Sequence, residues 1–269
     1  MAQDDYGPVW RDAGTDASSM NSWPSGGIDE ILSELQERYV PDMAHLDIPG
    51  LLKDTKLGRT AIVSSFGAES VVLLHYVVSV LPDIPVLFLD TGKHFPETLA
   101  YRDEVADALG LNLQVATPDS SLLEKEDPYG VLYGRDPNAC CTIRKTFPLQ
   151  DAIAPFDSWI SGRKRYQGAS RAALPILERD GEKIKINPMA SWLESDVRAY
   201  FARHDLPRHP LEANGYPSIG CAPCTQPVAA GDDQRAGRWA HMPDKTECGI
   251  HLGPDGRFVR SAQDRREGE

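Results

Sequence analysis

The segment TAIVSSFGAESVVLLHYVVSV, residues 60–80, carries an apolar run on each side of a short Ser/Gly turn. Thr60–Phe66 is short and rich in β-branched residues, which predicts a buried strand, and Glu69–Val80 is long enough to form a helix. Backbone N–H groups at the start of such a helix form a natural anion site at the carboxyl end of the strand. A tight turn that only packs explains these residues equally well, so the turn alone leaves both interpretations open.

The same alternation continues along the chain. Ile84–Leu89 is a second apolar run, and Pro96–Leu109 is a predicted helix that begins with proline and ends before Gly110. Short apolar strands that alternate with helices are typical of an α/β fold with a mainly parallel, twisted sheet flanked by helices. We expect further strands at Leu111–Ala116, Asp157–Ser161 and Lys183–Asn187, a first helix at Ile28–Tyr39, and a helix ending near His204 that is opened by a capping box of Ser191 and Glu194.

Composition divides the chain into three parts. Residues 1–27 are rich in Asp, Ser, Gly and Pro and predict a flexible tail. Residues 28–240 carry the α/β pattern, and residues 241–269 are expected to form a mobile C-terminal segment. We therefore expect one large domain between two appended segments.

The overall charge limits the partners that the chain can have. Its 269 residues carry a formal net charge of −12, which argues against binding to nucleic acid or to an anionic membrane. No run approaches the roughly 20 apolar residues of a membrane span, and acids occupy the N-terminal region where a signal peptide is basic. We expect a cytoplasmic protein, in which free thiols stay reduced.

Five cysteines occur, and an odd number argues against a closed set of disulfides. Cys140 and Cys141 are adjacent, and Cys221 and Cys224 form a CxxC pair. Four thiolates suffice for a zinc ion or an iron–sulfur cluster, and the spacing does not choose between them. Buried structural thiols and a redox-active CxxC remain the alternatives.

The fifth cysteine, Cys248, lies near the end of the chain between polar and glycine residues. A lone exposed cysteine is often incidental. Here Lys245 and His251 are close in sequence, and both favour the thiolate, which is the reactive form. Cys248 is thus a candidate nucleophile.

Basic residues are concentrated in three short segments of this acidic chain. They are Arg144-Lys145, the stretch from Arg163 to Arg171, and the stretch from Arg235 to Trp239. Arginine forks suit phosphate and sulfate oxygens, although each residue alone is more often a solvated surface charge. An anion site assembled from all three segments is the functional interpretation.

Three motifs resemble those of the sulfonucleotide reductases. ACCTIRK, residues 139–145, is similar to the CC-x-x-R-K signature of the assimilatory adenylyl sulfate (APS) reductases, and GYPSIGCAPCT, residues 215–225, is similar to their second cysteine segment. ECGIH, residues 247–251, resembles the motif that carries their nucleophile. The resemblance covers about residues 57–252 and implies an adenine nucleotide α-hydrolase-like, Rossmann-like fold.

The resemblance also implies a chemistry. Cys140, Cys141, Cys221 and Cys224 would hold one [4Fe–4S] cluster per subunit, and Cys248 would attack the sulfur of APS, expel AMP and become an S-sulfonate. Thioredoxin or a glutaredoxin-like dithiol would then release sulfite and restore the thiol. We also expect a homo-oligomer.

Residues of the substrate site follow from the same resemblance. The Ser/Gly turn and the end of the second strand would hold the nucleotide, and the basic segments would hold the phosphosulfate, with Arg163 and His251 as auxiliary residues and Arg165 in the structure of its loop. The family histidine that directly precedes the proline is replaced here by Phe95, so no role is assigned to His94. The predicted substrate-binding residues are Ser64, Ser65, Phe66, Gly67, Asp90, Thr91, Gly92, Lys145, Arg171, Arg235 and Arg238.

Three other functions are compatible with parts of the sequence. The same reaction on 3′-phosphoadenylyl sulfate (PAPS) is the nearest, but relatives that use it generally lack the four cysteines. An ATP-pyrophosphatase-type ligase or RNA-thiolating enzyme would need a Ser-Gly-Gly-x-Asp-Ser loop, whereas this chain has Phe66, Ala68 and Glu69 in the turn. A non-catalytic metal-binding module gives no reason for Cys248.

Overall fold

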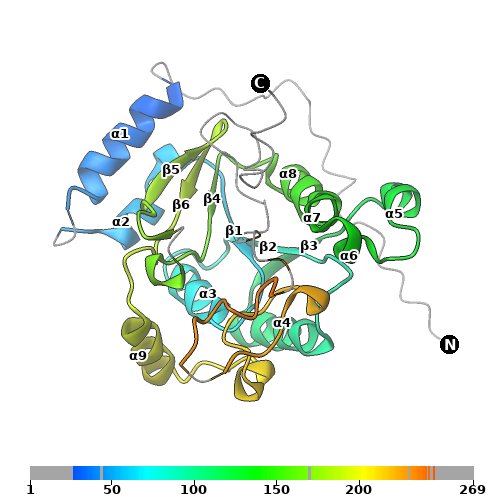
Figure 1. Ribbon diagram of the computed structural model, residues 1–269. Helices are drawn as coiled ribbons and strands as arrows, with labels where there is room; N and C mark the ends of the chain where they lie inside the picture. Colours follow the sequence, from blue (N-terminus) through cyan, green and yellow to red (C-terminus); the bar gives the residue numbers. More distant parts are fainter. Residues whose placement is uncertain are drawn as a thin grey trace.

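The computed structural model describes residues 27–42, 45–168, 171–229, 231–240, 242 and 245. Its centre is a six-stranded sheet with the order β3-β2-β1-β4-β6-β5, shown in Figure 1. All neighbouring strands are parallel except the last pair, in which β5 runs antiparallel to β6. The strands are β1 Thr60–Ser64, β2 Pro85–Leu89, β3 Asn112–Ala116, β4 Ser158–Ile160, β5 Leu177–Asp180 and β6 Lys183–Ile186.

The larger core lies on one face of the sheet. Strand residues Ile62, Phe88 and Ile184 pack there against apolar residues of the helices α1 Gly27–Tyr39, α2 Ile48–Leu52, α3 Ser70–Val78, α4 Pro96–Leu109 and α9 Glu194–His204. In Figure 1, α1 and α2 lie at the β5 side of the sheet and α4 lies toward the other side. Burial of these continuous apolar faces supplies the main driving force for the fold.

A smaller core lies on the opposite face. Ala61, Leu87 and Trp159 pack there against Leu149 and Ile153 of α8 Phe147–Ile153. The chain reaches α8 from β3 through three short helices, α5 Ser120–Glu126, α6 Leu132–Arg135 and α7 Pro137–Cys141, and then through a π-helical stretch, Thr142–Thr146. This connection brings the segment with the first two cysteines close to the carboxyl end of β2, where Arg144 contacts Thr91.

The predicted α/β fold with a mainly parallel sheet is confirmed. The helix predicted at Pro96–Leu109 has those bounds in α4, and Gly110 ends it with a φ of 61°. The first strand is two residues shorter than expected, because Phe66 takes a φ of 46° and turns its ring into the core against Phe88. The helix predicted at Ile28–Tyr39 begins one residue earlier, at Gly27.

The predicted capping box of α9 is wrong. The helix begins at Glu194, and its N-cap is Leu193 in an extended conformation. The Leu193 N–H donates to a carboxylate oxygen of Asp196 at 2.8 Å. Leu193 and Asp196 therefore take the places predicted for Ser191 and Glu194, because the chain enters the helix two residues later than the sequence pattern indicates.

In the described part of the chain, no helix combines the length and the apolar character that a membrane crossing requires.

Candidate functional site

A cavity of about 230 Å³ opens at the carboxyl ends of β1, β2 and β4. It is the place where an open α/β sheet binds a ligand. Its lining brings together segments far apart in the sequence: the turn after β1, the end of β2, the loop after β4 and both cysteine segments. Nine predicted substrate-site residues line it: Ser64, Ser65, Gly67, Thr91, Lys145, Arg163, Arg171, Arg235 and Arg238.

The turn after β1 is fixed by its own hydroxyls. Ser64 Oγ accepts from the Phe66 N–H at 3.2 Å, and Ser70 Oγ accepts from the Gly67 N–H at 2.9 Å. A Cβ on Gly67 would lie 3.2 Å from the Ile219 carbonyl oxygen, so the absence of a side chain lets the second cysteine segment approach closely. The turn thus presents its serines to the cavity while it packs against the chain that leads to Cys221.

The end of β2 connects the cavity to the cysteines. Asp90 accepts from the Gly92 N–H at 2.9 Å, which closes a tight turn, and Gly92 has a φ of 64°. Thr91 Oγ1 lies 3.3 Å from Cys221 Sγ. Three residues predicted to bind the substrate are not among the described residues that line the cavity. Phe66 is buried in the core, and Asp90 and Gly92 form the turn after β2.

The two cysteine segments meet beside the cavity. Asp136 accepts from the N–H groups of Asn138 and Ala139 and so caps α7, which carries Cys140 and Cys141. Burial raises the pKa of the Cys140 thiol to about 11; Arg144 opposes this, and Cys221 and Cys224 add to it. The two segments are therefore close enough for their thiols to interact electrostatically.

All four of these cysteines are buried and none forms a disulfide. Within the described residues, no three His, Cys, Asp or Glu side chains converge closely enough to surround a single metal ion. A four-iron cluster is larger than one ion, so thiolates that hold it stand farther apart. A buried set of four thiols beside the cationic cavity fits such a cluster in its chemistry, and the assignment of the cluster remains a prediction.

A buried ion pair anchors the first cysteine segment. Arg144 Nη2 donates to Asp127 Oδ2 at 2.7 Å, and the two side chains are 7% and 1% exposed. Burial alone would raise the pKa of Asp127, but the hydrogen bonds from Arg144 and from the Leu132 N–H outweigh it and lower that pKa. Arg144 also donates to the Thr91 carbonyl at 2.9 Å. This basic residue therefore ties the π-helical stretch to the end of β2.

Glu69 holds the loop after β4 against the start of α3. Its carboxylate accepts from Lys164 Nζ at 3.0 Å, from the Tyr166 hydroxyl at 2.7 Å and from Gln167 Nε2 at 2.9 Å. Gln167 in turn accepts from Arg171 Nη1 at 2.8 Å. Burial lowers the pKa of Lys164, and Glu69 opposes that shift.

Sequence reasoning missed the roles of Glu69, Lys164 and Gln167, which depend on contacts across about a hundred residues. Arg165 behaves as expected, because its Nε donates to the Leu174 carbonyl at 2.8 Å within its own loop.

Arg235 and Arg238 both lie over the ring of buried Trp239, at 5.7 and 4.6 Å from its centroid. A Cβ on Gly220 would clash with the Arg238 guanidinium, so this arginine fits directly against the residue before Cys221. Stacking on an aromatic ring fixes a guanidinium plane while its edge stays available for oxyanions. The two arginines thus extend the cationic wall to the second cysteine pair.

His94 lines the cavity although no role was predicted for it. Its Nε2 lies 2.9 Å from the Leu89 carbonyl oxygen, and its ring packs on Phe88 at 4.8 Å. Burial lowers the pKa of His94, which favours the neutral ring. The sequence alone does not predict that His94 lines the cavity, because its place there depends on how the chain turns at Gly92.

Cys248 and His251 lie outside the described residues. Lys245, three residues before Cys248, is described: its Nζ donates to Asn138 Oδ1 at 2.6 Å and lies over the Trp239 ring at 5.7 Å.

Comparisons with known proteins agree with this geometry. The model of the phosphoadenosine phosphosulfate reductase domain matches residues 59–227. An "adenosine 5′-phosphosulfate reductase" from Chelativorans sp. is 55% identical over 196 residues, covering 72% of this chain and 80% of that protein. One from Streptomyces coelicolor is 40% identical, covering 82% and 94%. A "phosphoadenosine 5′-phosphosulfate reductase" from Gloeobacter violaceus is 42% identical, covering 85% and 97%.

Among solved structures, the phosphate complex of phosphoadenylyl-sulfate (PAPS) reductase from Candida auris is similar with a TM-score of 0.62 at 23% identity. The match extends over 77% of this chain and 100% of the Candida auris chain, and at 23% identity it shows that the two chains share a fold. The domain match spans the turn after β1, the loop after β4 and all four buried cysteines. By its sequence, its fold and the residues gathered at its cavity, the chain belongs to the phosphoadenosine phosphosulfate reductase family.

Proposed function

We propose that the protein reduces APS to sulfite and AMP in sulfate assimilation, by way of an S-sulfonate on Cys248. The observation that carries this proposal is the cavity at the carboxyl ends of β1, β2 and β4, where five predicted cationic residues line one site in a chain with a net charge of −12. The relatives named adenosine 5′-phosphosulfate reductase, at 38–55% identity, support the same activity.

The described residues provide for binding. Ser64 and Ser65 line the cavity at the end of β1 and suit the nucleotide's phosphate. Lys145, Arg171, Arg235 and Arg238 line the same cavity and suit the phosphosulfate oxygens. Negative charge builds on the phosphate as it leaves, so these cations stabilise the transition state as well as the bound substrate.

The reaction balances with a dithiol as the reductant. The Cys248 thiolate forms a bond to the sulfur of APS, and the sulfur–oxygen bond to the phosphate breaks, so that its electron pair leaves with AMP. One thiolate of the dithiol then attacks Cys248 Sγ and releases sulfite, and its second thiol frees Cys248 and closes the dithiol to a disulfide. The two electrons that reduce the sulfur therefore come from the dithiol.

Cys140, Cys141, Cys221 and Cys224 are proposed to hold a [4Fe–4S] cluster. When bound, the cluster supplies a rigid, charged centre beside the cavity. Thr91 contacts Cys221, and Arg238 fits against Gly220, so the residues that bind the anion and the residues that hold the cysteines share contacts. This supports a role of the cysteine segments in positioning Lys145 and Arg238.

The same proposal includes a thioredoxin-like or glutaredoxin-like donor, a cytoplasmic location and a homo-oligomer. Lys245 supports access of the nucleophile, because it contacts Asn138 of α7 and Trp239 beside the second cysteine pair. In this proposal, Cys248 enters the cavity from the side on which the cysteine segments lie.

The alternative substrate is PAPS, which the name of the Gloeobacter relative favours. The four cysteines favour APS. Sulfite release should be measured with thioredoxin, its reductase and each nucleotide in turn. A kcat/KM for APS at least a hundredfold above that for PAPS is expected, whereas a preference for PAPS would replace the proposed substrate and no sulfite from either would remove the proposed activity.

A further inference from the structure

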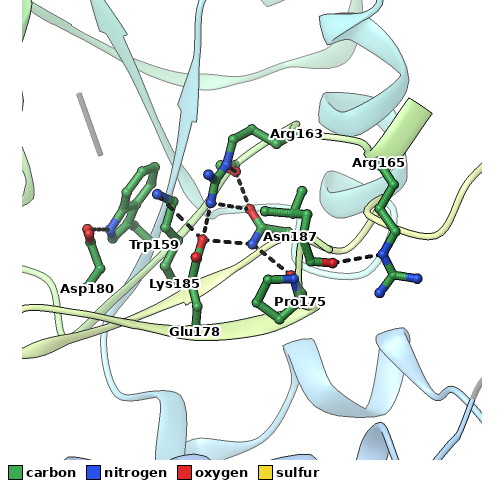
Figure 2. Close-up of polar contacts among 10 residues, drawn as sticks. Trp159, Arg163, Arg165, Pro175, Glu178, Asp180, Lys185 and Asn187 are labelled. Atoms are coloured by element: carbon green, nitrogen blue, oxygen red, sulfur yellow. Dashed lines mark hydrogen bonds and ion pairs between the residues drawn. The ribbon is translucent and has the colours of Figure 1, made fainter. Parts of the chain in front are cut away.

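Polar side chains of β4, β5 and β6 and of the loop after β4 contact one another beside the cavity (Figure 2). In the register of these strands Trp159 of β4 lies opposite Lys185 of β6, and Lys185 lies opposite Glu178 of β5. The three side chains therefore form one row on a single face of the sheet, the face opposite the larger core. Lys185 is 1% exposed, which is unusual for lysine and calls for a physical reason.

Glu178 is the centre of this network. Its Oε1 accepts from Arg163 Nη2 and from Asn187 Nδ2, the latter at 3.0 Å, and lies 3.6 Å from Lys185 Nζ. Figure 2 shows these contacts converging on the one carboxylate. Two cations from different segments thus share a single carboxylate oxygen.

Arg163 belongs both to the network and to the cavity. It lines the cavity together with Ser161 and Trp159. Its Nη2 also lies 3.4 Å from Asn187 Oδ1, and that oxygen accepts from Ser161 Oγ at 2.5 Å. Asn187 is fixed in turn by a 2.9 Å hydrogen bond from its Nδ2 to the Pro175 carbonyl. Glu178 and Asn187 therefore hold the Arg163 guanidinium in place, and neither of them is among the residues that line the cavity.

The charges of the network explain the buried lysine. The charges of a guanidinium and of one carboxylate in contact with it nearly cancel, so such a pair attracts a distant anion only weakly. Lys185 places a second positive charge on the same oxygen, and its Nζ also lies over the Trp159 ring, 4.4 Å from the centroid. The nearby Asp180 accepts from Trp159 Nε1 at 2.8 Å. With Lys185 protonated, the two cations Arg163 and Lys185 balance the two carboxylates of Glu178 and Asp180. Once Lys185 loses its proton, these four side chains carry a net negative charge beside the cavity.

We infer that Glu178 is a positioning residue for Arg163, and that Lys185 offsets the carboxylate charge behind Arg163 so that Arg163 attracts the nucleotide's anionic group. The inference rests on the proposed function for the identity of the anion. It adds to that function a buried lysine and a half-buried glutamate that tune the affinity of the site without contacting the substrate.

A pH dependence follows from the surroundings of Lys185. Burial and, to a smaller degree, the charge of Arg163 lower its pKa to about 8, although the charges of Asp180 and Glu178 oppose the shift. The groups that face it are thus Arg163 from the loop after β4, Trp159 from β4, and Glu178 and Asp180 from β5. As the pH rises through 8, Lys185 loses its charge, Glu178 is left to neutralise Arg163, and affinity for an anion falls. AMP does not change charge in this range, because its phosphate titrates near pH 6.

The test measures the Kd of AMP by calorimetry at pH 7 and pH 9, and the KM for APS at pH 7, on the intact protein. Lys185→Met keeps the length of the side chain and removes its charge. It should weaken AMP binding roughly tenfold at pH 7, raise KM by a similar factor with kcat changed less than twofold, and abolish the further weakening at pH 9 that the natural protein shows.

Charge rescue separates this role from a structural one. In Lys185→Met with Glu178→Gln, the carboxylate charge is also removed while its carbonyl oxygen remains as an acceptor for Arg163. Binding of AMP should return to within about twofold of the natural protein. Lys183→Met is the matched control: Lys183 lies on the same face of β6, but its Nζ contacts the Ala154 and Phe156 carbonyls, so binding and its pH dependence should not change.

The outcomes are distinct. If Lys185→Met binds AMP as tightly as the natural protein, or if the double variant binds as weakly as the single one, Lys185 has no electrostatic role and the inference is wrong. Should the variant fail to fold, the pH dependence of AMP binding to the natural protein decides, because a flat profile from pH 7 to 9 overturns the inference. If the natural protein releases no sulfite from APS, the proposed function fails instead, while binding of AMP still tests the network.

Discussion

The Thr91 hydroxyl lies 3.3 Å from the sulfur of Cys221. Both side chains are buried, and they come from residues 130 positions apart. Thr91 lies in the turn after β2, and Cys221 is the first residue of the second cysteine pair. The contact therefore joins the proposed nucleotide site to the proposed cluster site in one packed unit.

Replacement of Thr91 by valine tests this contact. Valine keeps the shape but removes the hydroxyl, and a hydrogen bond of this kind contributes about 1 kcal/mol, or roughly a fivefold effect. We expect the visible absorption of the anaerobic protein to bleach about fivefold faster in the presence of an iron chelator. Thr91→Ser, which keeps the hydroxyl, is the control and should bleach at the natural rate; equal rates for all three proteins would contradict the role of the contact.

Asp127→Asn should destabilise the fold strongly. It breaks the buried pair with Arg144 and leaves a buried guanidinium without its counter-charge, which costs about 3–5 kcal/mol. The free energy of unfolding in urea measures the loss. Arg198→Gln, which breaks an exposed pair with Glu194 on α9, is the control and should cost less than 1 kcal/mol. Similar losses in the two variants would show that the buried pair is no anchor.

Glu69→Gln should loosen the cationic loop. The change leaves Lys164 without its carboxylate and weakens the contacts that place Gln167 and, through it, Arg171. We expect KM for APS to rise roughly tenfold, equivalent to about 1.4 kcal/mol of binding. Glu69→Asp, which keeps the charge, should recover part of this loss. An unchanged KM in Glu69→Gln would separate the loop from substrate binding.

His209 makes the fold sensitive to acid. Burial lowers its pKa to about 4, and Glu97 opposes the shift. Its Nδ1 accepts from the Leu211 N–H at 3.2 Å, and its Nε2 lies 3.0 Å from Thr98 Oγ1, so the neutral ring suits both contacts. The unfolded chain takes up a proton near pH 6.5 and the folded protein only near pH 4. The contribution of the neutral ring to stability is therefore complete above pH 6.5 and is lost as the pH falls from 6.5 to 4.

Thermal unfolding between pH 7 and pH 4 measures this effect. In His209→Gln, the Tm should start lower at pH 7 and fall less steeply toward pH 4 than in the natural protein. A parallel fall in the two proteins would assign the acid sensitivity to other groups.

The sequence predicted those elements whose signals are local. The bounds of α4 followed from Pro96 and Gly110, and the buried strands followed from unbroken apolar runs such as Ile84–Leu89, of which Pro85–Leu89 forms β2. The edge strand β5 was missed, because LERD is mostly charged and is a strand only through its pairing with β6. The predicted cap of α9 was wrong. Asp196 follows Leu193 at the same spacing at which Glu194 follows Ser191, and the sequence alone does not show which of the two pairs begins the helix.

The candidate site divides in the same way. The resemblance to the sulfonucleotide reductases assigned Lys145, Arg171, Arg235 and Arg238 to the substrate site, and the fold brings these residues to one cavity. Glu69, Glu178 and Lys185 were not predicted, because their roles depend on contacts between segments that only the folded sheet brings together. Phe66 was assigned to the substrate site by the same resemblance, whereas its positive φ sends the ring into the core.

The mass of the intact protein after exposure to APS reports directly on the proposed S-sulfonate. Anaerobically prepared protein is mixed with APS in the absence of any dithiol, and the mass is measured before and after digestion. We predict a gain of one sulfonate per chain, located on Cys248, absent in Cys248→Ser, and removed by reduced thioredoxin with release of sulfite. Release of sulfite while Cys248 stays unmodified, or a sulfonate on any other cysteine, would show that Cys248 is not the nucleophile.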